Sequence, residues 1–354
     1  MMTIYIIAGL VAAIALTGIV FVNQKSFGRL PQGARLERIE QSPHYVEGRF
    51  CNELKTRQLT SSKGFVRTMW DFLFKEYPNV TPEEPVAAIK TDLKTLPRDS
   101  DLVVWFGHSS YLLQLDGKRM LVDPVLVHGS PVRFIGKAFK GADIFKPEDM
   151  PAVDYMIATH DHWDHLDYWT QTALRDSISQ VVTPLGVGEH FEYWDFDPAR
   201  ICELDWYEHQ AFADGFTFHC FPTRHFSGRG LSRNRTLWGS FVIEAPSGKR
   251  VYVGGDGGYS THFQKIGDRF PGMNLAILEN GQYGEGWAEI HTLPEQLGKE
   301  MKDLCANHYI TVHHSKFALA QHPWDEPFKN ELKAAKEAGV RLTVLTIGEV
   351  MPIE

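Results

Sequence analysis

The longest uninterrupted hydrophobic pattern lies at the N-terminus. Residues 4–22 carry no charge over 19 positions. At about 1.5 Å per residue, a helix of this length crosses the roughly 30 Å hydrocarbon core of a bilayer. No Lys or Arg precedes the segment and no small-x-small site ends it, which favours a retained anchor over a cleaved signal peptide or a buried helix. We therefore expect residues 1–23 to be a single-pass anchor, and Lys25, Arg29 and Arg35 to hold that flank, and the catalytic domain with it, in the cytoplasm.

A different pattern follows over residues 24–100. Residues 23–64 are polar with scattered Gly and Pro, which is typical of a linker and an extended arm. Large apolar residues then recur at spacings of three and four over 65–77, and this predicts an aromatic-rich helix with a wide apolar face. That face would either pack on the protein core or meet a membrane or substrate groove. Pro78, Pro82 and Pro85 end the helix.

From about Asp101 the pattern changes to short apolar runs separated by turn residues, interspersed with helical patterns. Asp116-Gly117 between two such runs predicts a β-hairpin. Strands mixed with helices, with hairpins in each half, predict an α/β domain with two mixed sheets over residues 101–354. The predicted strands are 101–106, 111–115, 120–122, 153–158, 180–183, 216–221, 239–243, 250–253 and 309–312, and the predicted helices lie near 169–177, 292–304 and 326–338.

The strongest chemical signal directly follows the predicted strand 153–158. Residues 159–167 read Thr-His-Asp-His-Trp-Asp-His-Leu-Asp. On extended chain, residues two apart point to the same side, so His160 and His162 can bind one ion together. If the chain then turns into a helix, Asp164 and His165 face a second ion. Imidazole and carboxylate ligands suit Zn²⁺, with Fe or Mn as further options. We therefore expect two metal ions, chiefly zinc.

Further ligands have to come from elsewhere, and several strands end in a suitable residue. His225 comes shortly after the strand 216–221, and His313 and His314 directly follow 309–312. Asp256 stands among four glycines just past another strand, where the backbone can approach an ion closely. A His or Asp repeatedly placed at a strand end favours a shared site for all of them.

Composition narrows the possible partners. The net charge is −8, and no basic stripe of the kind that binds nucleic acid is present. None of the four cysteines stands in a Cys-x-x-Cys pair, which disfavours a thiolate zinc site. Nucleic acid is therefore not an expected partner.

The order His-x-His-x-Asp-His, later His, later Gly-Asp and last His resembles the metallo-β-lactamase superfamily. Longer sequence segments are similar to those of the branch that contains N-acylphosphatidylethanolamine-hydrolysing phospholipase D and its bacterial relatives. This similarity extends from about residue 35 to residue 350. This resemblance implies a four-layer αββα sandwich with two mixed β-sheets. The similar segments are Trp-Phe-Gly-His-Ser-Ser at 105–110, Leu-Val-Asp-Pro at 121–124, Gly-Gly-Asp-Gly-Gly-Tyr at 254–259 and His-Pro-Trp-Asp-Glu-Pro at 322–327.

The resemblance also implies roles for individual residues. His313 is favoured over His314 as the last ligand because Phe317 follows it by four positions, although His314-Ser315 stands where the family has Trp-Gly. His291 matches a position near the substrate. The implied set is His160, His162 and His225 for one metal, Asp164, His165 and His313 for the other, Asp256 as the bridge, and His108 and Asp123 as residues that orient ligand imidazoles.

The implied activity is hydrolysis of a phosphodiester by a hydroxide shared between two metals. Asp164, Asp256 and His291 are then the catalytic residues, and the substrate is an N-acylphosphatidylethanolamine-like phospholipid at a membrane. The chain could also act as a homodimer. Alternatives are hydrolysis of a soluble lactone, ester or small phosphodiester, a nuclease, which the acidic charge disfavours, and a non-catalytic metal-binding membrane protein.

Overall fold

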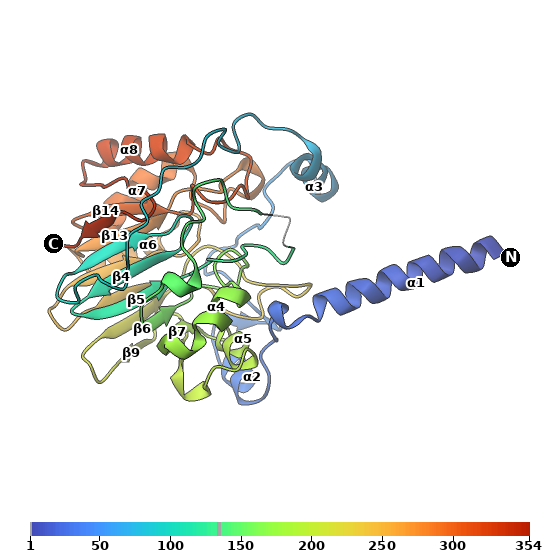
Figure 1. The fold of residues 1–354 in the computed structure, drawn as a ribbon, viewed down its shortest axis with the longest axis horizontal. Coiled ribbons are helices and arrows are strands. Elements are labelled where there is room, and N and C mark those ends of the chain that lie inside the picture. The colour runs from blue at the N-terminus through green and yellow to red at the C-terminus, as the bar shows by residue number, and fades with distance from the viewer. Residues whose placement is uncertain (1, 133–135) are drawn as a thin grey trace.

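Two β-sheets form the centre of the computed structural model, which describes residues 2–132 and 136–354 (Figure 1). The first sheet has seven strands in the order β15-β3-β4-β5-β6-β7-β8, and the second has six in the order β14-β13-β12-β11-β10-β9. The strands of the first sheet are β3 (Leu102–Trp105), β4 (Tyr111–Leu115), β5 (Lys118–Val122), β6 (Val153–Ile157), β7 (Ile178–Pro184), β8 (Ile201–Leu204) and β15 (Val350–Pro352). Those of the second are β9 (His209–Ala211), β10 (Thr217–Phe221), β11 (Ser240–Glu244), β12 (Arg250–Val253), β13 (Leu275–Glu279) and β14 (Tyr309–Val312).

Both sheets mix parallel and antiparallel strands. β3, β4 and β5 are antiparallel, whereas β5 to β8 are parallel. The predicted hairpin joins β4 and β5, where Asp116 and Gly117 have φ of 45° and 77°, as a two-residue type I′ turn requires. In the second sheet, β12, β13 and β14 are parallel and the other pairs are antiparallel. The predicted class, α/β with two mixed sheets, is confirmed.

Helices cover the outer faces of the sheets. α6 (His262–Arg269), α7 (Pro294–Leu304) and α8 (Glu326–Ala338) share a buried apolar cluster with the outer side of the six-stranded sheet. α4 (Tyr168–Leu174) and α5 (Gly188–Tyr193) lie on the other side of the molecule (Figure 1). A larger apolar core joins the two sheets and includes Trp105, Phe218 and Trp238. These layers are those of the αββα sandwich, which is likewise confirmed.

The polar segment over residues 23–64 is not a free linker. It contains α2 (Gly33–Glu40) and a short hairpin of β1 (Tyr45–Val46) and β2 (Arg49–Phe50). Ile39 and Phe50 are fully buried in the main core. A few apolar side chains are therefore enough to attach this polar segment to the domain, and they are too sparse to form a periodic pattern in the sequence.

Two helices stand on one side of the molecule (Figure 1). α1 (Met2–Val22) projects from the body, and its window Tyr5–Val22 has a mean hydropathy of 2.5 with no part buried inside the protein. It is the one helix among the described residues long and apolar enough to cross a membrane. α3 (Phe65–Phe74) ends three residues before the predicted end at Tyr77, and its Trp70 and Phe74 are 58% and 64% exposed.

Candidate metal centre

Three imidazoles meet where two strands of different sheets end. His160 and His162 follow β6, and His225 follows β10. The Nε2 atoms of His160 and His225 lie 2.9 Å and 3.2 Å from Nδ1 of His162. The extended chain after β6 turns both histidines to one side, as expected from their spacing. The structure thus brings together the residues predicted for the first metal.

A second group forms next to it. One ligand atom each of Asp164, His165, His313 and His108 lie within 4.8 Å of one another. The chain here makes a turn, in which the N–H of His165 bonds the carbonyl of His162 at 3.1 Å, and α4 begins only after Asp167. A turn, rather than a helix, therefore carries Asp164 and His165, and it brings both side chains to the place expected for a second ion.

Asp256 lies between the two groups. Its Oδ1 is 3.2 Å from Nε2 of His165 and 3.1 Å from Nδ1 of His313, and its Oδ2 is 3.8 Å from Nε2 of His225. The preceding Gly255 has φ of 62°, and a Cβ there would lie 2.7 Å from the carbonyl oxygen of Gly239. Only glycine fits this position, and it lets the carboxylate reach both groups. The arrangement has the geometry expected of a bridging ligand.

Nε2 of His162 is buried without a hydrogen-bond partner among the described residues. Nε2 of His165 and Oδ1 of Asp256 lie 3.2 Å apart, but neither makes a hydrogen bond with the other or with another described atom. An orphaned buried nitrogen or carboxylate oxygen is costly unless something else satisfies it. Burial and neighbouring imidazoles hold the pKa of His160 well below its usual value, so it is neutral and able to donate a lone pair. Burial alone would raise the pKa of Asp256, but His165 and His313 hold it well below normal. Neutral imidazoles around a charged carboxylate fit a pair of divalent metal ions.

The surroundings of His165 support the same conclusion. Burial opposes its protonation, yet Asp256, Asp164 and Asp123 together raise the pKa of His165 well above its ordinary value. Three carboxylates around one buried imidazole attract positive charge, which a bound metal ion would supply in place of the proton. Of these, Asp123 Oδ2 accepts from Nδ1 of His165 at 2.7 Å, which leaves Nε2 turned toward Asp256. Asp123 thus lies where an imidazole-orienting residue is expected.

His108 occupies a comparable outer position. Its Nε2 lies 2.9 Å from Oδ2 of Asp164, and its ring lies 4.2 Å from that of His313. His108, Asp123 and His313 have φ of 52°, 39° and 73°. Left-handed backbone is unfavourable for such residues and persists only where the surroundings fix it, which is common at functional sites.

The two neighbouring histidines 313 and 314 separate clearly. His313 lies in the cluster, whereas His314 is buried away from it, with Nδ1 at 2.8 Å from Ser315 Oγ and its ring 4.8 Å from Trp105. Nδ1 of His314 therefore already has a hydrogen-bond partner in Ser315. The geometry favours His313 as the ligand.

His291 lies at the edge of the cluster and brings with it a residue that the sequence did not suggest. Its Nδ1 is 3.0 Å from Oε2 of Glu279, the last residue of β13, and 4.0 Å from Oδ2 of Asp256. Burial raises the pKa of Glu279 to about 7. Burial lowers the pKa of His291, but the carboxylate of Glu279 more than offsets this and raises it. Glu279 could have been found from the rule that strand ends carry the site.

Asn52 is a second contributor that was missed. Its Oδ1 accepts from the N–H of His225 at 3.1 Å, and its Nδ2 donates to the carbonyl of His225 at 2.8 Å. Arg57 of the same arm pairs with Glu289 at 2.8 Å, two residues before His291. The N-terminal arm therefore holds the segments that carry His225 and His291. A lone Asn in a polar segment gave no signal in the sequence.

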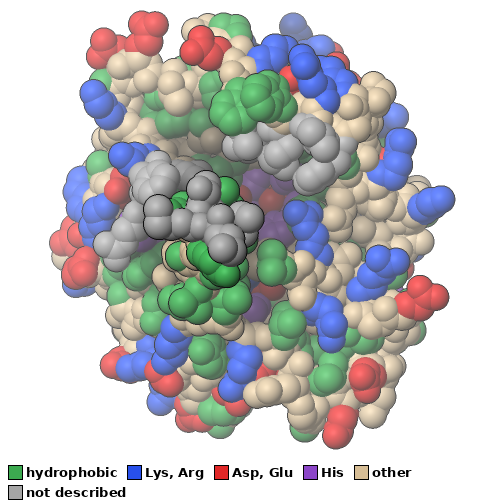
Figure 2. All heavy atoms as spheres, turned by 90° about the vertical axis from the view of Figure 1, so that its right-hand side faces the viewer, with side chains coloured by type: hydrophobic (Ala, Val, Ile, Leu, Met, Phe, Trp, Pro, Cys, Tyr) green, Lys and Arg blue, Asp and Glu red, His purple; other side chains and the backbone are tan. Residues whose placement is uncertain are grey.

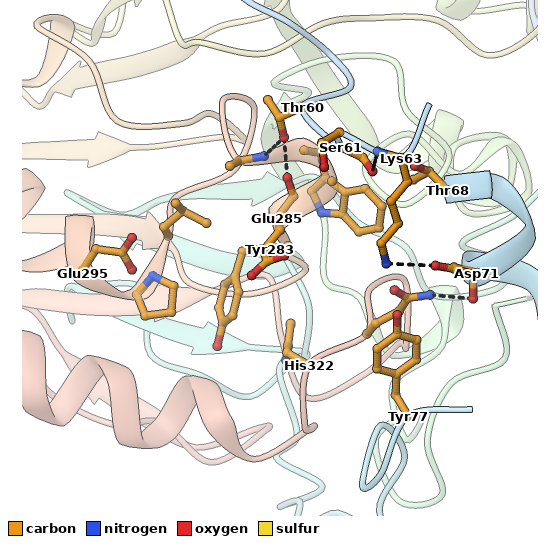
Figure 3. Close-up of a pocket in the computed structure, with 18 residues that line it drawn as sticks. Thr60, Ser61, Lys63, Thr68, Asp71, Tyr77, Tyr283, Glu285, Glu295 and His322 are labelled. Carbon is orange, nitrogen blue, oxygen red and sulfur yellow. Dashed lines mark hydrogen bonds and ion pairs between the residues drawn. The ribbon is translucent and has the colours of Figure 1, made fainter. Parts of the chain in front are cut away.

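The cluster lies in a hollow on the face from which α1 projects. Figure 2 looks onto this face and shows histidine side chains in a central depression with hydrophobic side chains gathered near it. A separate cavity of about 690 Å³ lies between α3 and the turn before α7, and none of the seven predicted ligands lines it. Figure 3 shows Tyr283 and His322 on one side of that cavity and the Lys63–Asp71 ion pair on the other.

Comparison with known proteins agrees with the site. A sequence model described as "Beta-lactamase superfamily domain" matches residues 118–314. The archaeal metallo hydrolase Igni18 of Ignicoccus hospitalis has the same fold, with a TM-score of 0.55 at 19% identity over 72% of this chain and 99% of that one. The chain belongs to the metallo-β-lactamase superfamily.

Two relatives narrow the assignment. An uncharacterized protein of Mycobacterium tuberculosis is 36% identical over 315 residues, which cover 88% of this chain and 84% of the relative. N-acyl-phosphatidylethanolamine-hydrolyzing phospholipase D 1 of Caenorhabditis elegans is 27% identical over 247 residues, which cover 66% of this chain and 69% of the relative. Within the superfamily, the chain is thus similar to an N-acyl-phosphatidylethanolamine-hydrolyzing phospholipase D.

Proposed function

We propose that this metallo-hydrolase cleaves the head-group phosphodiester of a membrane phospholipid of the N-acylphosphatidylethanolamine type. The observation that carries the proposal is the shared orientation of three features. The histidine cluster opens on the face from which the apolar α1 projects, and α3 exposes Trp70 and Phe74 on the same side (Figures 1 and 2). An anchor at residues 1–23 would hold this face of the hydrolase domain, residues 101–354, against the lipid surface.

The residues present can hold two ions. His160, His162 and His225 would hold one, Asp164, His165 and His313 the other, and Asp256 would reach both. When bound, such ions activate water for nucleophilic attack and neutralise charge on the phosphoryl oxygens. Zinc fits the imidazole-rich set best, with iron or manganese as alternatives.

The protein's own groups then handle the leaving group. Nδ1 of His291 is engaged by Glu279 at 3.0 Å, so Nε2 is the nitrogen free to meet substrate. In the imidazolium form that Glu279 stabilises, Nε2–H can bond the phosphate and give its proton to the departing head-group alkoxide. Water adds to phosphorus as the bond to the head-group oxygen breaks, and phosphatidic acid and a neutral alcohol result.

The test is a substrate panel on metal-loaded, full-length protein in detergent micelles. We expect release of the head group from N-acylphosphatidylethanolamine and much slower turnover of soluble lactones, carboxylic esters and small phosphodiesters. Asp256→Asn should abolish all metal-dependent turnover. Faster turnover of a soluble substrate would replace the lipid proposal with the soluble-hydrolase alternative. Stoichiometric metal without turnover of any substrate would favour a non-catalytic metal-binding protein.

A further inference from the structure

A cavity of about 510 Å³ lies at the base of α1, apart from the metal cluster. Val22 and Asn23 at the end of the helix line one side, and residues 228–232 with Arg235 line the other. None of the seven predicted metal ligands lines it. If α1 crosses a membrane, the position of Val22 puts this cavity at the level of the lipid head groups.

The charges around this cavity do not balance. Arg29 is paired with Glu189 at 2.5 Å. Asp161, the one carboxylate in the lining, is already engaged by His190 at 3.1 Å, Thr236 at 2.8 Å and the N–H of Gly228 at 2.7 Å. Arg235 is half-buried, and no hydrogen bond or ion pair of its side chain is found among the described residues. One guanidinium is thus left without a counter-ion.

Arg229 adds a second positive charge to the lining. It is 5% exposed and stacks on Trp163 at 4.0 Å, and its terminal nitrogens donate to the carbonyls of Asp161 and Ser26 at 3.0 Å and 2.9 Å. Its Nε is buried and has no hydrogen-bond partner in the described part of the chain. Arg229 and the unpaired Arg235 line the same cavity, and two guanidinium groups at one site favour a phosphate.

Part of the remaining lining is apolar, and two leucines in it are exposed. Leu231 is 91% exposed and Leu30 is 45% exposed, and both line the cavity together with Val22 and Phe27. Such exposure of a leucine beside the end of an apolar helix is unfavourable in water but favourable where the side chain enters the acyl region of a bilayer. The cavity therefore combines cationic arginine side chains with exposed leucines at its edge.

We propose that this cavity binds the anionic head group of a membrane phospholipid, distinct from the substrate. Arg235 and Arg229 contact the phosphate, and the acyl chains run along α1 and Leu231. The inference rests on the membrane-anchoring part of the proposed function. It does not depend on which phosphodiester the metal centre cleaves.

The probes are dioctanoylphosphatidylglycerol, dioctanoylphosphatidylcholine and inorganic phosphate, titrated into full-length protein in neutral detergent micelles. We expect the phosphatidylglycerol to bind at least tenfold more tightly than either other probe. Arg235→Gln should raise its Kd at least tenfold, whereas Arg200→Gln, the same change at an exposed residue outside the cavity, should leave it unchanged. Leu231→Asp alters an exposed side chain, so it should fold normally and also raise the Kd.

Three results would overturn the site: equal Kd values for the three probes, phosphatidylglycerol binding that survives both Arg235→Gln and Leu231→Asp, or no binding at all. A high-salt wash of membranes separates this failure from that of the anchor. If the protein stays with the membrane but shows no preference for the anionic lipid, the anchor is supported and only the head-group site is wrong. Protein that the wash releases has no anchor, and the head-group site is then wrong as well.

Discussion

The pair formed by Glu279 and His291 yields the most specific prediction about catalysis. Oε2 of Glu279 lies 3.0 Å from Nδ1 of His291, and its Oε1 accepts from the N–H of Thr292 at 2.6 Å. Glu279→Gln keeps the size of the side chain but offers only one oxygen for these two donors. A buried hydrogen bond to a charged group contributes about 1.5–3 kcal/mol, so kcat should fall by roughly 10- to 150-fold.

The variant should also change the pH profile. Glu279 raises the pKa of His291, and a proton-donating His291 is active only below that pKa. Activity in the wild type is therefore lost as pH rises through the His291 pKa. Without the carboxylate this pKa falls, so the alkaline limb of kcat should move to lower pH in Glu279→Gln.

The assay measures kcat and KM against pH on one phosphodiester substrate for four proteins: wild type, the two single variants Glu279→Gln and His291→Ala, and the double variant. If Glu279 acts through His291, the double variant should be no slower than His291→Ala. His291→Ala should raise KM at least as much as it lowers kcat if the imidazole contacts the phosphate. Additive losses, or an unshifted alkaline limb in Glu279→Gln, would refute the pairing.

Four other measurements test the rest of the structure. Elemental analysis of protein purified without chelators should find about two metal ions per chain, and a value well under one would remove the site assignment. Deleting residues 1–23 should release the protein from membranes with its metal content unchanged; a truncated protein that still sediments in high salt would implicate Trp70 and Phe74 as a second contact. Asp164→Ala should lower kcat and kcat/KM together by roughly 100-fold or more, about 2.7 kcal/mol, and near-normal turnover would mean that one metal suffices. Burial raises the pKa of Glu331, which accepts from Thr311, to about 8. From pH 4.5 to about 8 only the folded state keeps this proton, so the free energy of unfolding should fall by on the order of 5 kcal/mol as pH rises through that window. Glu331→Gln should flatten that slope in denaturant titrations, and an unchanged slope would show that another group titrates.

Much of the architecture was predictable because burial leaves a strong pattern in short strands. The runs that became β3, β4, β6 and β12 stood out because nearly every residue in them is apolar and buried. α5 was missed because its buried face includes Glu189 and His190, whose partners come from distant segments. Periodicity of apolar residues cannot reveal a face that is polar and satisfied by long-range bonds.

The residues of the candidate site likewise fall into two groups: those that a local motif reveals and those that it does not. Candidate ligands at strand ends could be found because a short motif constrains its own geometry, as in the case of His160 and His162. Asn52 acts through contacts with the backbone of His225, and nothing local in the sequence distinguishes it from a solvated residue. Glu279 ends a strand, but its contact with His291 forms only in the folded chain. The burial that raises the pKa of Glu279 is created only when the strand packs.

The clamp of Asn52 on His225 bears on how this protein reaches its active form. The two residues are 173 positions apart, so their contact closes a very long loop. Asn52 leaves the ribosome well before His225, and residue 313 is later still, so an emerging chain has no complete set of ligands until its last strands are made. Metal uptake at the proposed site would then be a late event in biogenesis. In refolding experiments, metal binding should be slower than the recovery of the helical circular dichroism signal. Its rate should be limited by the docking of the N-terminal arm.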